Sequence, residues 1–308
     1  MDRIKTVSFV GMGCLGMLYG GIMSENIGSE NVSFIMDEER YLRHEKDRYI
    51  VNGEEKHYQM RTGDEVKPVD LLVFSVKFNA LSEAIELARP AVSENTIIVS
   101  LLNGISSEKV LEEHFDREQI VDSLCVGMDS VRDGVQLSYT KIGHWEIGAH
   151  NEKQEENVRL VKELCDRAGV PCEVKEDIRH AIWNKFMINV GINQTCMVHN
   201  KTYGVAAESG EAYDDLVAAM REVILVAPYE GVELTEEELE RNIALLADLD
   251  KDKYPSMQQD ALAKRKSEVE LFAGTMIKLA EKHGLDVPVN RRYYEAIKKM
   301  EAEYGQKD

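Results

Sequence analysis

The feature that most constrains this fold is a glycine motif near the start of the chain, formed by Gly11, Met12, Gly13, Cys14, Leu15 and Gly16. The motif directly follows an apolar run and opens a helical pattern. In such a place the first glycine permits a tight turn, the second lets the backbone approach a pyrophosphate, and the third lets helix and strand pack closely. The motif therefore predicts a dinucleotide site, and the alternative is a glycine-rich turn without a ligand.

The first half of the chain alternates apolar runs of strand length with helical patterns. The apolar runs cover residues 7–10, 32–36, 71–76, 96–101 and 120–125, and the helical patterns cover residues 15–24, 80–88 and 107–114. Continuous apolar runs are typical of strands buried on both faces, and their alternation with helices predicts βαβ units in a parallel sheet. A hairpin is expected over residues 49–58, because Asn52-Gly53 suits a type I′ turn. Short strands near residues 135–140 and 145–147 are expected to extend the sheet.

The second half follows a helical period almost throughout. After a helix over residues 152–168 and a strand over 172–174, helices are expected over residues 178–199, 211–229, 235–247, 256–283 and 291–303. Thr235 and Glu238 have the spacing of a capping box, and Gly231 and Gly284 are suitable helix stops. The sequence thus predicts an α/β fold: an N-terminal Rossmann-like doubly wound sheet that binds a dinucleotide (1–175), followed by an all-helical C-terminal domain for substrate and catalysis (176–308).

Charge narrows the possible partners. The chain has 37 Lys and Arg against 56 Asp and Glu, a formal net charge of −19. Such a field repels phosphate backbones and anionic lipid headgroups, so neither nucleic acid nor a membrane is expected as a partner. No apolar run approaches the roughly 18 to 20 residues that span a bilayer, and the first residues do not resemble a signal peptide. We expect a cytoplasmic protein.

The cysteines predict thiols and not a metal centre. There are five of them, without any C-x-x-C pair, in otherwise apolar surroundings. An odd number in such surroundings favours buried, reduced side chains over a disulfide framework or a zinc site. No metal ligand set is therefore predicted.

Asp37 is the candidate that bears on the choice of cofactor. It ends the second predicted strand, 21 residues after Gly16, where a carboxylate can accept hydrogen bonds from the ribose hydroxyls of adenosine. A 2′-phosphate would meet an anion there, so NADH is favoured over NADPH. Alternatively, Asp37 caps the helix that follows, and both roles can coexist. Arg40 and Arg43 could instead reach a 2′-phosphate and offset the carboxylate.

Two further candidates follow predicted strands. Lys77 comes after the run at 71–76, and Asn103-Gly104 come after the run at 96–101. Open α/β sheets bind their ligands at the carboxyl ends of the strands. Each residue alone could be an ordinary loop residue, but together they are candidate contacts for the nicotinamide or a ribose.

The helix expected over residues 178–199 carries the strongest catalytic candidates. Lys185, Asn189 and Asn193 are spaced by four, so they line one helix face among large apolar neighbours. If buried, such polar groups need partners. A solvated helix face is the alternative. We favour a functional face, because asparagine is a poor residue in the middle of a helix.

A second polar cluster lies between residues 256 and 270. Ser256 could cap a helix or bind a substrate carboxylate, and Glu268 could orient a lysine ammonium. Spacing alone assigns this segment no chemistry, and by itself it is typical of a charged helix.

Taken together, these motifs resemble the ketopantoate reductase (2-dehydropantoate 2-reductase) family over nearly the whole chain. The resemblance rests on the glycine motif, Lys77, Asn103-Gly104, the pattern W-x-K-x-x-x-N-x-x-x-N from Trp183 to Asn193, and S-M-x-Q-D followed by R-x-[ST]-E from Ser256 to Glu268. It implies an oxidoreductase of pantothenate biosynthesis that transfers a hydride from NAD(P)H to a 2-keto acid, above all 2-dehydropantoate, which becomes pantoate.

The resemblance also implies roles for individual residues. Lys185 is the general acid, and the 2-keto acid is held by Asn189, Asn193 and Ser256. Lys77 and Asn103 contact the cofactor or the substrate, and Glu268 orients the catalytic centre near the cofactor. Late helices with one apolar face suggest a homodimer.

The chain departs from the family pattern at three places. Asp37 stands where the family has a basic residue. The family usually binds NADPH. The family's I-N-P-L-T-A reads Ile192 to Met197 here, and its late Asn-Gly reads Ala273-Gly274. Two alternatives therefore stay open. One is an NAD-dependent dehydrogenase of another branched 2-keto acid or of a 3-hydroxy acid, and the other is a dinucleotide-binding sensor without turnover.

Overall fold

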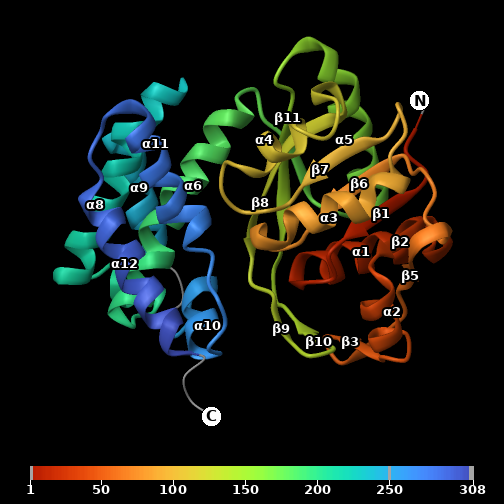
Figure 1. Ribbon diagram of the computed structural model, residues 1–308, viewed down its shortest axis with the longest axis horizontal. Coiled ribbons are helices and arrows are strands. Elements are labelled where there is room, and N and C mark those ends of the chain that lie inside the picture. The colour runs from red at the N-terminus through yellow and green to blue at the C-terminus, as the bar shows by residue number, and fades with distance from the viewer. Residues whose placement is uncertain (1–2, 249–250, 305–308) are drawn as a thin grey trace. The chain divides into compact units, whose positions relative to one another are not determined.

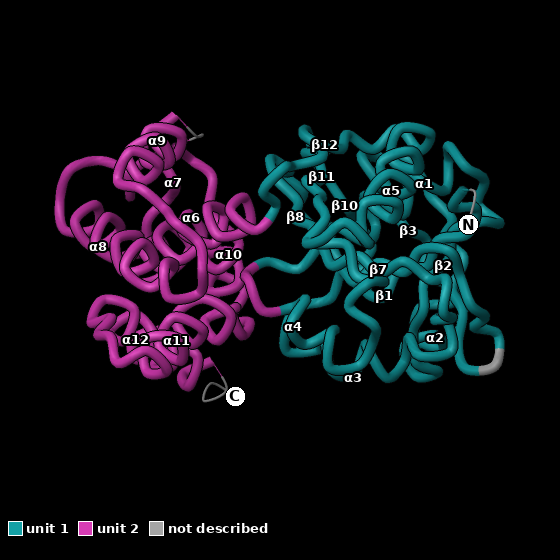
Figure 2. Tube along the Cα trace, turned by 90° about the horizontal axis from the view of Figure 1, so that it is seen from above, with its two compact units in different colours: residues 1–103, 107–178 teal, residues 104–106, 179–308 magenta. Residues whose placement is uncertain are grey.

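The computed structural model of the chain describes residues 3–248 and 251–304 (Figure 1). The chain divides into two compact units, which Figure 2 colours separately. The first unit comprises residues 1–103 and 107–178, and the second comprises residues 104–106 and 179–308. No helix in the described part of the chain is both long enough and apolar enough to cross a membrane.

The first unit is built on an eight-stranded sheet in the order β12-β11-β8-β7-β6-β1-β2-β5. Its strands are β1 (Val7–Val10), β2 (Val32–Ile35), β5 (Gln59–Arg61), β6 (Leu71–Phe74), β7 (Ile97–Ser100), β8 (Ile120–Met128), β11 (Ile142–Gly148) and β12 (Cys172–Val174). Neighbouring strands are parallel except β8 and β11. The predicted doubly wound α/β sheet is confirmed.

Two apolar cores lie on opposite faces of this sheet. The covering helices are α1 (Cys14–Ile27), α2 (Glu38–His44), α3 (Leu81–Ala88), α4 (Ser107–Glu112) and α5 (Glu155–Ala168). Helices α1 and α5 lie on one face of the sheet and α3 and α4 on the other (Figure 2). Alternate residues of one strand enter different cores: Val73 packs with α1 and α5, whereas Leu72 and Phe74 pack with α3 and α4. The strands are apolar without interruption because both faces are covered.

A second, four-stranded sheet in the order β4-β3-β10-β9 completes the first unit. Its strands are β3 (Tyr49–Val51), β4 (Glu54–Lys56), β9 (Val131–Asp133) and β10 (Gln136–Ser138). The predicted hairpin is confirmed, with φ of 49° at Asn52 and 86° at Gly53.

One of the two short strands expected to extend the main sheet was placed wrongly. The strand near 145–147 does join that sheet as β11, but the strand near 135–140 is β10, which pairs with β3 and β9. The chain turns back on itself after β8, and Leu137 is the only fully buried residue of β10. A strand with so little apolar surface suits the small sheet better than the middle of the large one.

The second unit is helical, as predicted. Its helices are α6 (Ile178–His199), α7 (Tyr203–Ala206), α8 (Glu211–Val226), α9 (Glu236–Ala247), α10 (Ser256–Leu262), α11 (Thr275–His283) and α12 (Pro288–Glu303). Thr235 and Glu238 form the predicted capping box. Gly231 and Gly284 follow helical segments in the left-handed conformation, as expected for helix stops.

The prediction of one continuous helix over residues 256–283 is wrong. Helix α10 ends at Leu262, Lys264 takes a left-handed conformation, and the helix resumes as a π-helix, η8 (Glu270–Gly274), that leads into α11. The charged residues 264–266 are exposed and offer no apolar face for packing, so nothing holds them in a helix. The backbone folds back instead, and Arg265 N donates to Asp260 O at 2.8 Å.

Proline sets two other helix ends that the sequence analysis misplaced by a few residues. Helix α8 stops at Val226, before Pro228 in the 3₁₀ turn η7 (Ala227–Glu230). Helix α12 begins at Pro288, three residues before the expected start. Proline lacks a backbone N–H, so it is tolerated in a first turn and disfavoured inside a helix.

All five cysteine thiols are free. Cys125, Cys165 and Cys196 are buried, while Cys14 and Cys172 are partly exposed. The prediction of buried thiols therefore holds for three of the five, and their reduced state stays a prediction.

Candidate active site

The glycine turn joins β1 to α1, and the fold itself requires two of its glycines. Gly11 has φ of 106°, and a Cβ atom on it would lie 2.7 Å from the carbonyl carbon of Ser75. A Cβ on Gly16 would lie 2.1 Å from Gly11 O. The Ser75 hydroxyl donates to Gly11 O at 2.8 Å and holds the turn against β6. Any larger residue at Gly11 or Gly16 would force the turn open.

Gly13 differs from the other two glycines of the motif. A Cβ on Gly13 would have only Ser75 O within 4 Å, at 3.7 Å, which is an ordinary contact. Packing within the protein therefore does not require glycine here, and the space where a Cβ would stand is open. Gly13 is also the N-cap of α1, whose first turn has no acidic residue and no side-chain cap. An anion such as a pyrophosphate fits a bare, positive helix start of this kind.

The sheet topology gathers the other predicted cofactor residues at the same edge. Strands β7, β6, β1 and β2 are parallel neighbours in that order. Asp37, Lys77 and Asn103 lie in the loops after β2, β6 and β7, just as the glycine turn follows β1. From β1 the chain crosses to β2 on one side of β1, and it later returns to β6 on the other side. The direction of the strand order thus reverses at β1, and open α/β sheets bind ligands at such a switch point.

The structure confirms the helix-capping role of Asp37. Its Oδ1 accepts from Arg40 N at 2.7 Å at the start of α2. The Arg40 side chain forms ion pairs with Asp37 and Glu83, at 3.2 and 3.5 Å, and Arg43 pairs with Glu39. Both arginines that could have favoured a 2′-phosphate are therefore already engaged with carboxylates.

Lys77 and Asn103-Gly104 occupy the two remaining loops. Lys77 is exposed and begins the 3₁₀ turn η3 (Phe78–Ala80), and Asn103 is half-buried at the end of a segment of the first unit. Gly104 has φ of 88°, and a Cβ on it would lie 2.7 Å from Leu271 Cδ1. Glycine at 104 is thus required by close packing against η8.

In the second unit, the structure brings three of the predicted substrate residues together. On α6, Asn193 is 5% exposed, and its Nδ2 donates to Asn189 Oδ1 at 3.2 Å. Asn193 Oδ1 accepts from Ser256 Oγ at 3.1 Å. The buried amide thus links one exposed and one half-buried polar side chain, and Lys185 lies one helical turn before Asn189, also half-buried.

Ser256 does not cap α10. Pro255 holds the N-cap position, and Ser256 is the first residue of the helix. Its hydroxyl donates across to Asn193 of α6, 63 positions away in the sequence. The capping interpretation is therefore wrong. The Ser256 side chain on α10 instead bonds to the polar face of α6.

The π-helix η8 is anchored to α6 by a buried side chain that the sequence analysis did not single out. Gln194 is fully buried, its Nε2 donates to Asn290 Oδ1 at 3.1 Å, and its Oε1 accepts from Ala273 N at 3.1 Å. The Phe186 and Phe272 rings, with centroids 6.3 Å apart, add an apolar contact between the same elements. This packing holds the segment that begins with Glu268, which is half-buried and whose main-chain O accepts from Leu271 N at 2.9 Å.

Arg132 is a second residue that sequence reasoning missed. It lies on β9 of the small sheet, and its Nη1 donates to Met12 O in the glycine turn, 120 positions earlier. No motif surrounds Arg132, so nothing in the local sequence connects it with the turn. Only the pairing of β9 within the small sheet brings it there.

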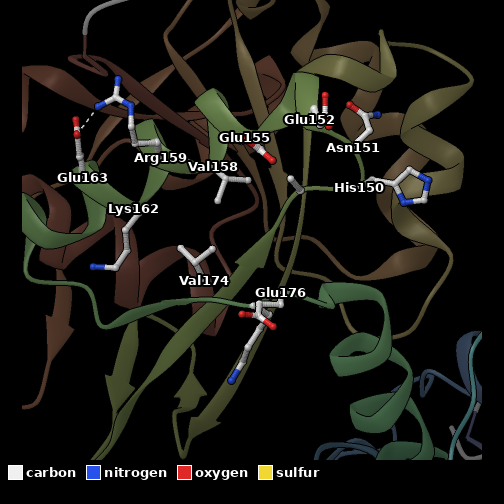
Figure 3. Close-up of a pocket in the computed structure, with 12 residues that line it drawn as sticks. His150, Asn151, Glu152, Glu155, Val158, Arg159, Lys162, Glu163, Val174 and Glu176 are labelled. Atoms are coloured by element: carbon white, nitrogen blue, oxygen red, sulfur yellow. Dashed lines mark hydrogen bonds and ion pairs between the residues drawn. The ribbon is translucent and has the colours of Figure 1, made fainter.

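A cavity of about 580 Å³ lies elsewhere in the first unit, beside α5 and β12 (Figure 3). Val158 and Val174 form the apolar part of the cavity wall. Charged residues form the rest, among them Arg159 and Glu163, which pair with each other. None of the predicted site residues lines this cavity. Its position assigns it no part in the predicted chemistry.

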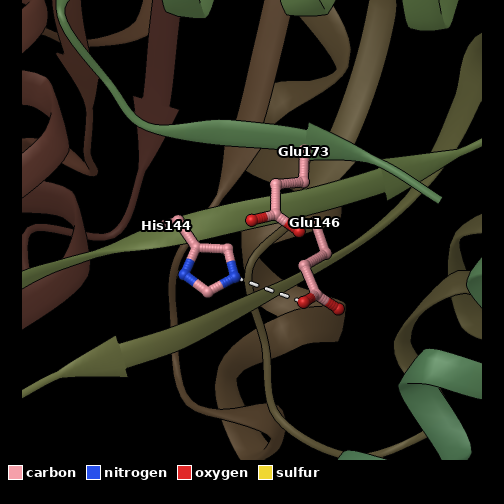
Figure 4. Close-up of side chains that lie close together, drawn as sticks. All are labelled: His144, Glu146 and Glu173. Carbon is pink, nitrogen blue, oxygen red and sulfur yellow. Dashed lines mark hydrogen bonds and ion pairs between the residues drawn. The ribbon is translucent and has the colours of Figure 1, made fainter.

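One group of side chains in the described part of the chain has metal-ligand character (Figure 4). Ligand atoms of His144, Glu146 and Glu173, on β11 and β12, lie within 4.8 Å of one another. Lys175 Nζ lies 3.0 Å from Glu146 Oε1 and 2.8 Å from Glu173 Oε2. The two carboxylates therefore already share one lysine ammonium, and a cation at this place would have to displace it.

Comparison with known proteins assigns both halves of the chain to one family. Residues 7–152 match the family "Ketopantoate reductase PanE/ApbA", and residues 177–301 match "Ketopantoate reductase PanE/ApbA C terminal". Among curated relatives, the 2-dehydropantoate 2-reductase of Halobacterium salinarum is 26% identical over 297 residues, covering 94% of this chain and 96% of the relative. That of Streptococcus pyogenes serotype M1 is 23% identical over 244 residues, covering 79% of this chain and 80% of the relative.

Solved structures share the fold. A ternary complex of D-mandelate dehydrogenase with NADH and anilino(oxo)acetate superposes with a TM-score of 0.86 at 20% identity, covering 97% of this chain and 99% of the other. The 2-dehydropantoate 2-reductase from Geobacter metallireducens superposes with a TM-score of 0.84 at 22% identity, covering 96% and 99%. At these identities the likeness concerns the fold, and the chemistry must be argued from the residues of this chain.

Proposed function

Because the chain belongs to the ketopantoate reductase family, we propose that it reduces a 2-keto acid with NAD(P)H, with 2-dehydropantoate as the substrate and pantoate as the product. The observation that carries this proposal is the open space at Gly13, at a helix start that lacks an anionic partner, in a chain that also bears the Lys185, Asn189 and Asn193 face. A glycine turn without a ligand would not need glycine at position 13.

The first unit has the cofactor-binding part of the proposed reaction. When bound, the reduced nicotinamide supplies the hydride that adds to the ketone carbon. The N–H groups at the start of α1 bind the pyrophosphate, and Asp37 accepts from the adenosine ribose hydroxyls. Lys77 and Asn103, at the neighbouring strand ends, contact the nicotinamide half or the substrate.

The second unit supplies the acid and the substrate contacts. As an ammonium group, Lys185 stabilises the negative charge that grows on the ketone oxygen and then donates a proton to it, a role worth about 10² to 10⁴ in rate. Asn189, Asn193 and Ser256 bind the carboxylate and hydroxyl groups without adding a competing charge. Glu268 orients the Lys185 ammonium.

NADH is the preferred cofactor in this proposal. The Asp37 carboxylate disfavours a 2′-phosphate, and Arg40 and Arg43 are paired with acids. Replacing Asp37 by serine keeps a helix cap and removes the charge. We expect D37S to raise kcat/KM for NADPH relative to NADH by about tenfold. A wild-type enzyme with the lower KM for NADPH would contradict this preference.

The test of the function is a steady-state screen of 2-keto acids with both reduced cofactors. The panel contains ketopantoate, 2-oxo-3-methylbutanoate and an aryl 2-oxoacetate, together with a 3-hydroxy acid assayed with NAD⁺. We expect the highest kcat/KM with ketopantoate. Preference for another 2-keto acid would keep the reaction and change the substrate. Cofactor binding without turnover on any of these would instead favour the sensor.

The proposal includes a homodimer in the cytoplasm. A ketopantoate reductase from Staphylococcus aureus with the same fold is described as dimeric. Here Leu225, Tyr229 and Leu245 are large apolar side chains exposed on or near α8 and α9, 46%, 55% and 63% respectively. Such residues are candidates for burial between subunits. Sedimentation equilibrium tests the dimer, and the free thiols are in keeping with a reducing compartment.

A further inference from the structure

The Arg132 side chain is held so that it points at the glycine turn. Its Nη1 donates to Met12 O, and its Nε donates to Gly134 O at 2.7 Å. The second bond closes the tight turn between β9 and β10, so the arginine is braced by its own hairpin. Two of its three nitrogens are engaged with main-chain oxygens, and the side chain is half-buried.

The third nitrogen, Nη2, has no partner among residues 3–248 and 251–304, and Arg132 forms no ion pair within that part of the chain. This is notable in a chain where 56 acidic residues face 37 basic ones. Some other acceptor must satisfy the two N–H groups of Nη2, and water or a ligand are the choices.

The surroundings of Arg132 make an anion the better choice. Cys14, the first residue of α1, lies close enough for the guanidinium to act against the burial that raises the pKa of its thiol. The first turn of α1 has no acidic residue and no side-chain cap. A guanidinium and the positive end of a helix thus lie side by side, and among residues 3–248 and 251–304 Arg132 has no carboxylate within ion-pair distance. Two positive groups in this arrangement repel each other unless an anion lies between them.

We propose that Arg132 is a phosphate-binding residue of the dinucleotide site: Nη1 holds the Met12 carbonyl, and Nη2 donates to a pyrophosphate oxygen beside Gly13. The inference rests on the proposed function, because it takes a dinucleotide to be the ligand of the glycine turn. The planar guanidinium suits this double task, since its N–H groups point in fixed directions and can serve a carbonyl and a phosphate together.

The test measures the binding of ADP, adenosine and NADH to the full chain and to its R132Q and R132K variants. Calorimetry measures the binding of ADP and NADH. Adenosine binding is measured by its displacement of NADH, which changes the NADH fluorescence. We expect R132Q to weaken ADP and NADH about 10- to 100-fold, the effect of one charge-assisted hydrogen bond. Adenosine, which lacks phosphate, should bind R132Q as it binds the wild type. R132K keeps the charge and should recover part of the ADP affinity.

The matched control is R159Q. Arg159 lies on α5 of the same unit, is paired with Glu156 and Glu163, and is far from the glycine turn in the sequence. It should leave ADP binding unchanged. Thermal unfolding of each variant, followed by circular dichroism, verifies that the binding data refer to folded protein.

Three outcomes would overturn the inference. Unchanged ADP affinity in R132Q would show that no phosphate contact was lost. Equal losses for ADP and adenosine would show that Arg132 only holds the turn in shape. Tighter ADP binding would show that the side chain occupies the phosphate position. In all three the wild type still binds NADH, and the proposed function stands. A wild type that binds neither ADP nor NADH would overturn the proposed function and the inference with it.

Discussion

The glycine turn of the first unit and the polar face of α6 in the second unit are built by different means. The turn consists of six consecutive residues, and the main chain provides its shape and its N–H donors. The polar face consists of side chains, and its central residue Asn193 is held by Ser256, 63 positions away. The comparison teaches that a site made of backbone can be recognised from local spacing, whereas a site made of side chains depends on distant partners.

The largest effect that would sharpen this comparison is expected from Lys185→Ala. If the second unit supplies the acid and the first holds the cofactor, K185A should lower kcat by about 10² to 10⁴ and leave the Kd for NADH unchanged. Stopped-flow turnover and fluorescence titration measure the two quantities. The exposed Lys278 of α11 provides the control variant, K278A. Turnover of K185A within a few-fold of the wild type would contradict the acid assignment.

Within the turn, two glycine variants sharpen the comparison. The fold requires glycine at position 16, whereas at position 13 only a ligand would require it. Gly16→Ala places Cβ against Gly11 O and should lower the free energy of unfolding by roughly 2 to 4 kcal/mol. Gly13 has φ of −79°, which alanine also adopts, so G13A should cost less than about 1 kcal/mol. NADH binding by G13A should still weaken about tenfold or more, because the methyl group occupies the phosphate position.

Urea unfolding and NADH titration of both glycine variants check this pair. Normal NADH affinity in a folded G13A protein would show that nothing binds close to Gly13. Equal stability of G16A and the wild type would show that the turn can open at little cost, which would contradict the close packing of α1 on β1.

Two neighbouring residues of α6, Asn193 and Gln194, allow binding and packing roles to be distinguished in the second unit. Gln194→Ala leaves Ala273 N and Asn290 Oδ1 without their partner and should lower the free energy of unfolding by about 2 to 3 kcal/mol, with the KM for the keto acid unchanged. Asn193→Ala should raise that KM about tenfold, at a smaller cost in stability, because Ser256 is exposed and can bond to water. Similar KM values for the two variants would remove the distinction between a binding and a packing residue.

The smallest effect concerns Glu108. This side chain lies in the first unit, the same unit as the glycine turn. Burial, reinforced by the Asp122 carboxylate, raises the pKa of Glu108 from 4.5 to about 7. The folded protein therefore binds more protons than the unfolded chain between these values, and its free energy of unfolding falls as the pH rises from about 4.5 to 7. Glu108→Gln stays neutral and should be more stable than the wild type at pH 8, by roughly 1 to 3 kcal/mol.

Urea unfolding at about pH 5.5 and pH 8 measures this difference, with the exposed Glu113 as control in E113Q. The gap between E108Q and the wild type should widen toward pH 8. A constant gap at both pH values would show that the Glu108 carboxyl does not titrate in this range.

Most of the fold could be predicted because its signals are local or periodic. The strand runs, the Asn52-Gly53 turn and the Thr235 capping box each involve neighbouring residues and formed as predicted. The helix expected over residues 256–283 broke because a helical period does not show whether a partner covers the helix. Residues 264–266 have no such partner. The strand β10 was assigned to the wrong sheet for a related reason, since pairing depends on which edge is available.

By itself, the amino-acid sequence determined the glycine turn, the class of the two units and the face on which Lys185 lies. These depend on backbone conformation and on the repeat of a helix, which a few adjacent residues control. Only the tertiary structure decided that Arg132 meets Met12, that Ser256 meets Asn193, and that Gln194 anchors η8. Those contacts join segments 63 to 120 positions apart, and which side chains meet across such a distance is settled only when the elements pack.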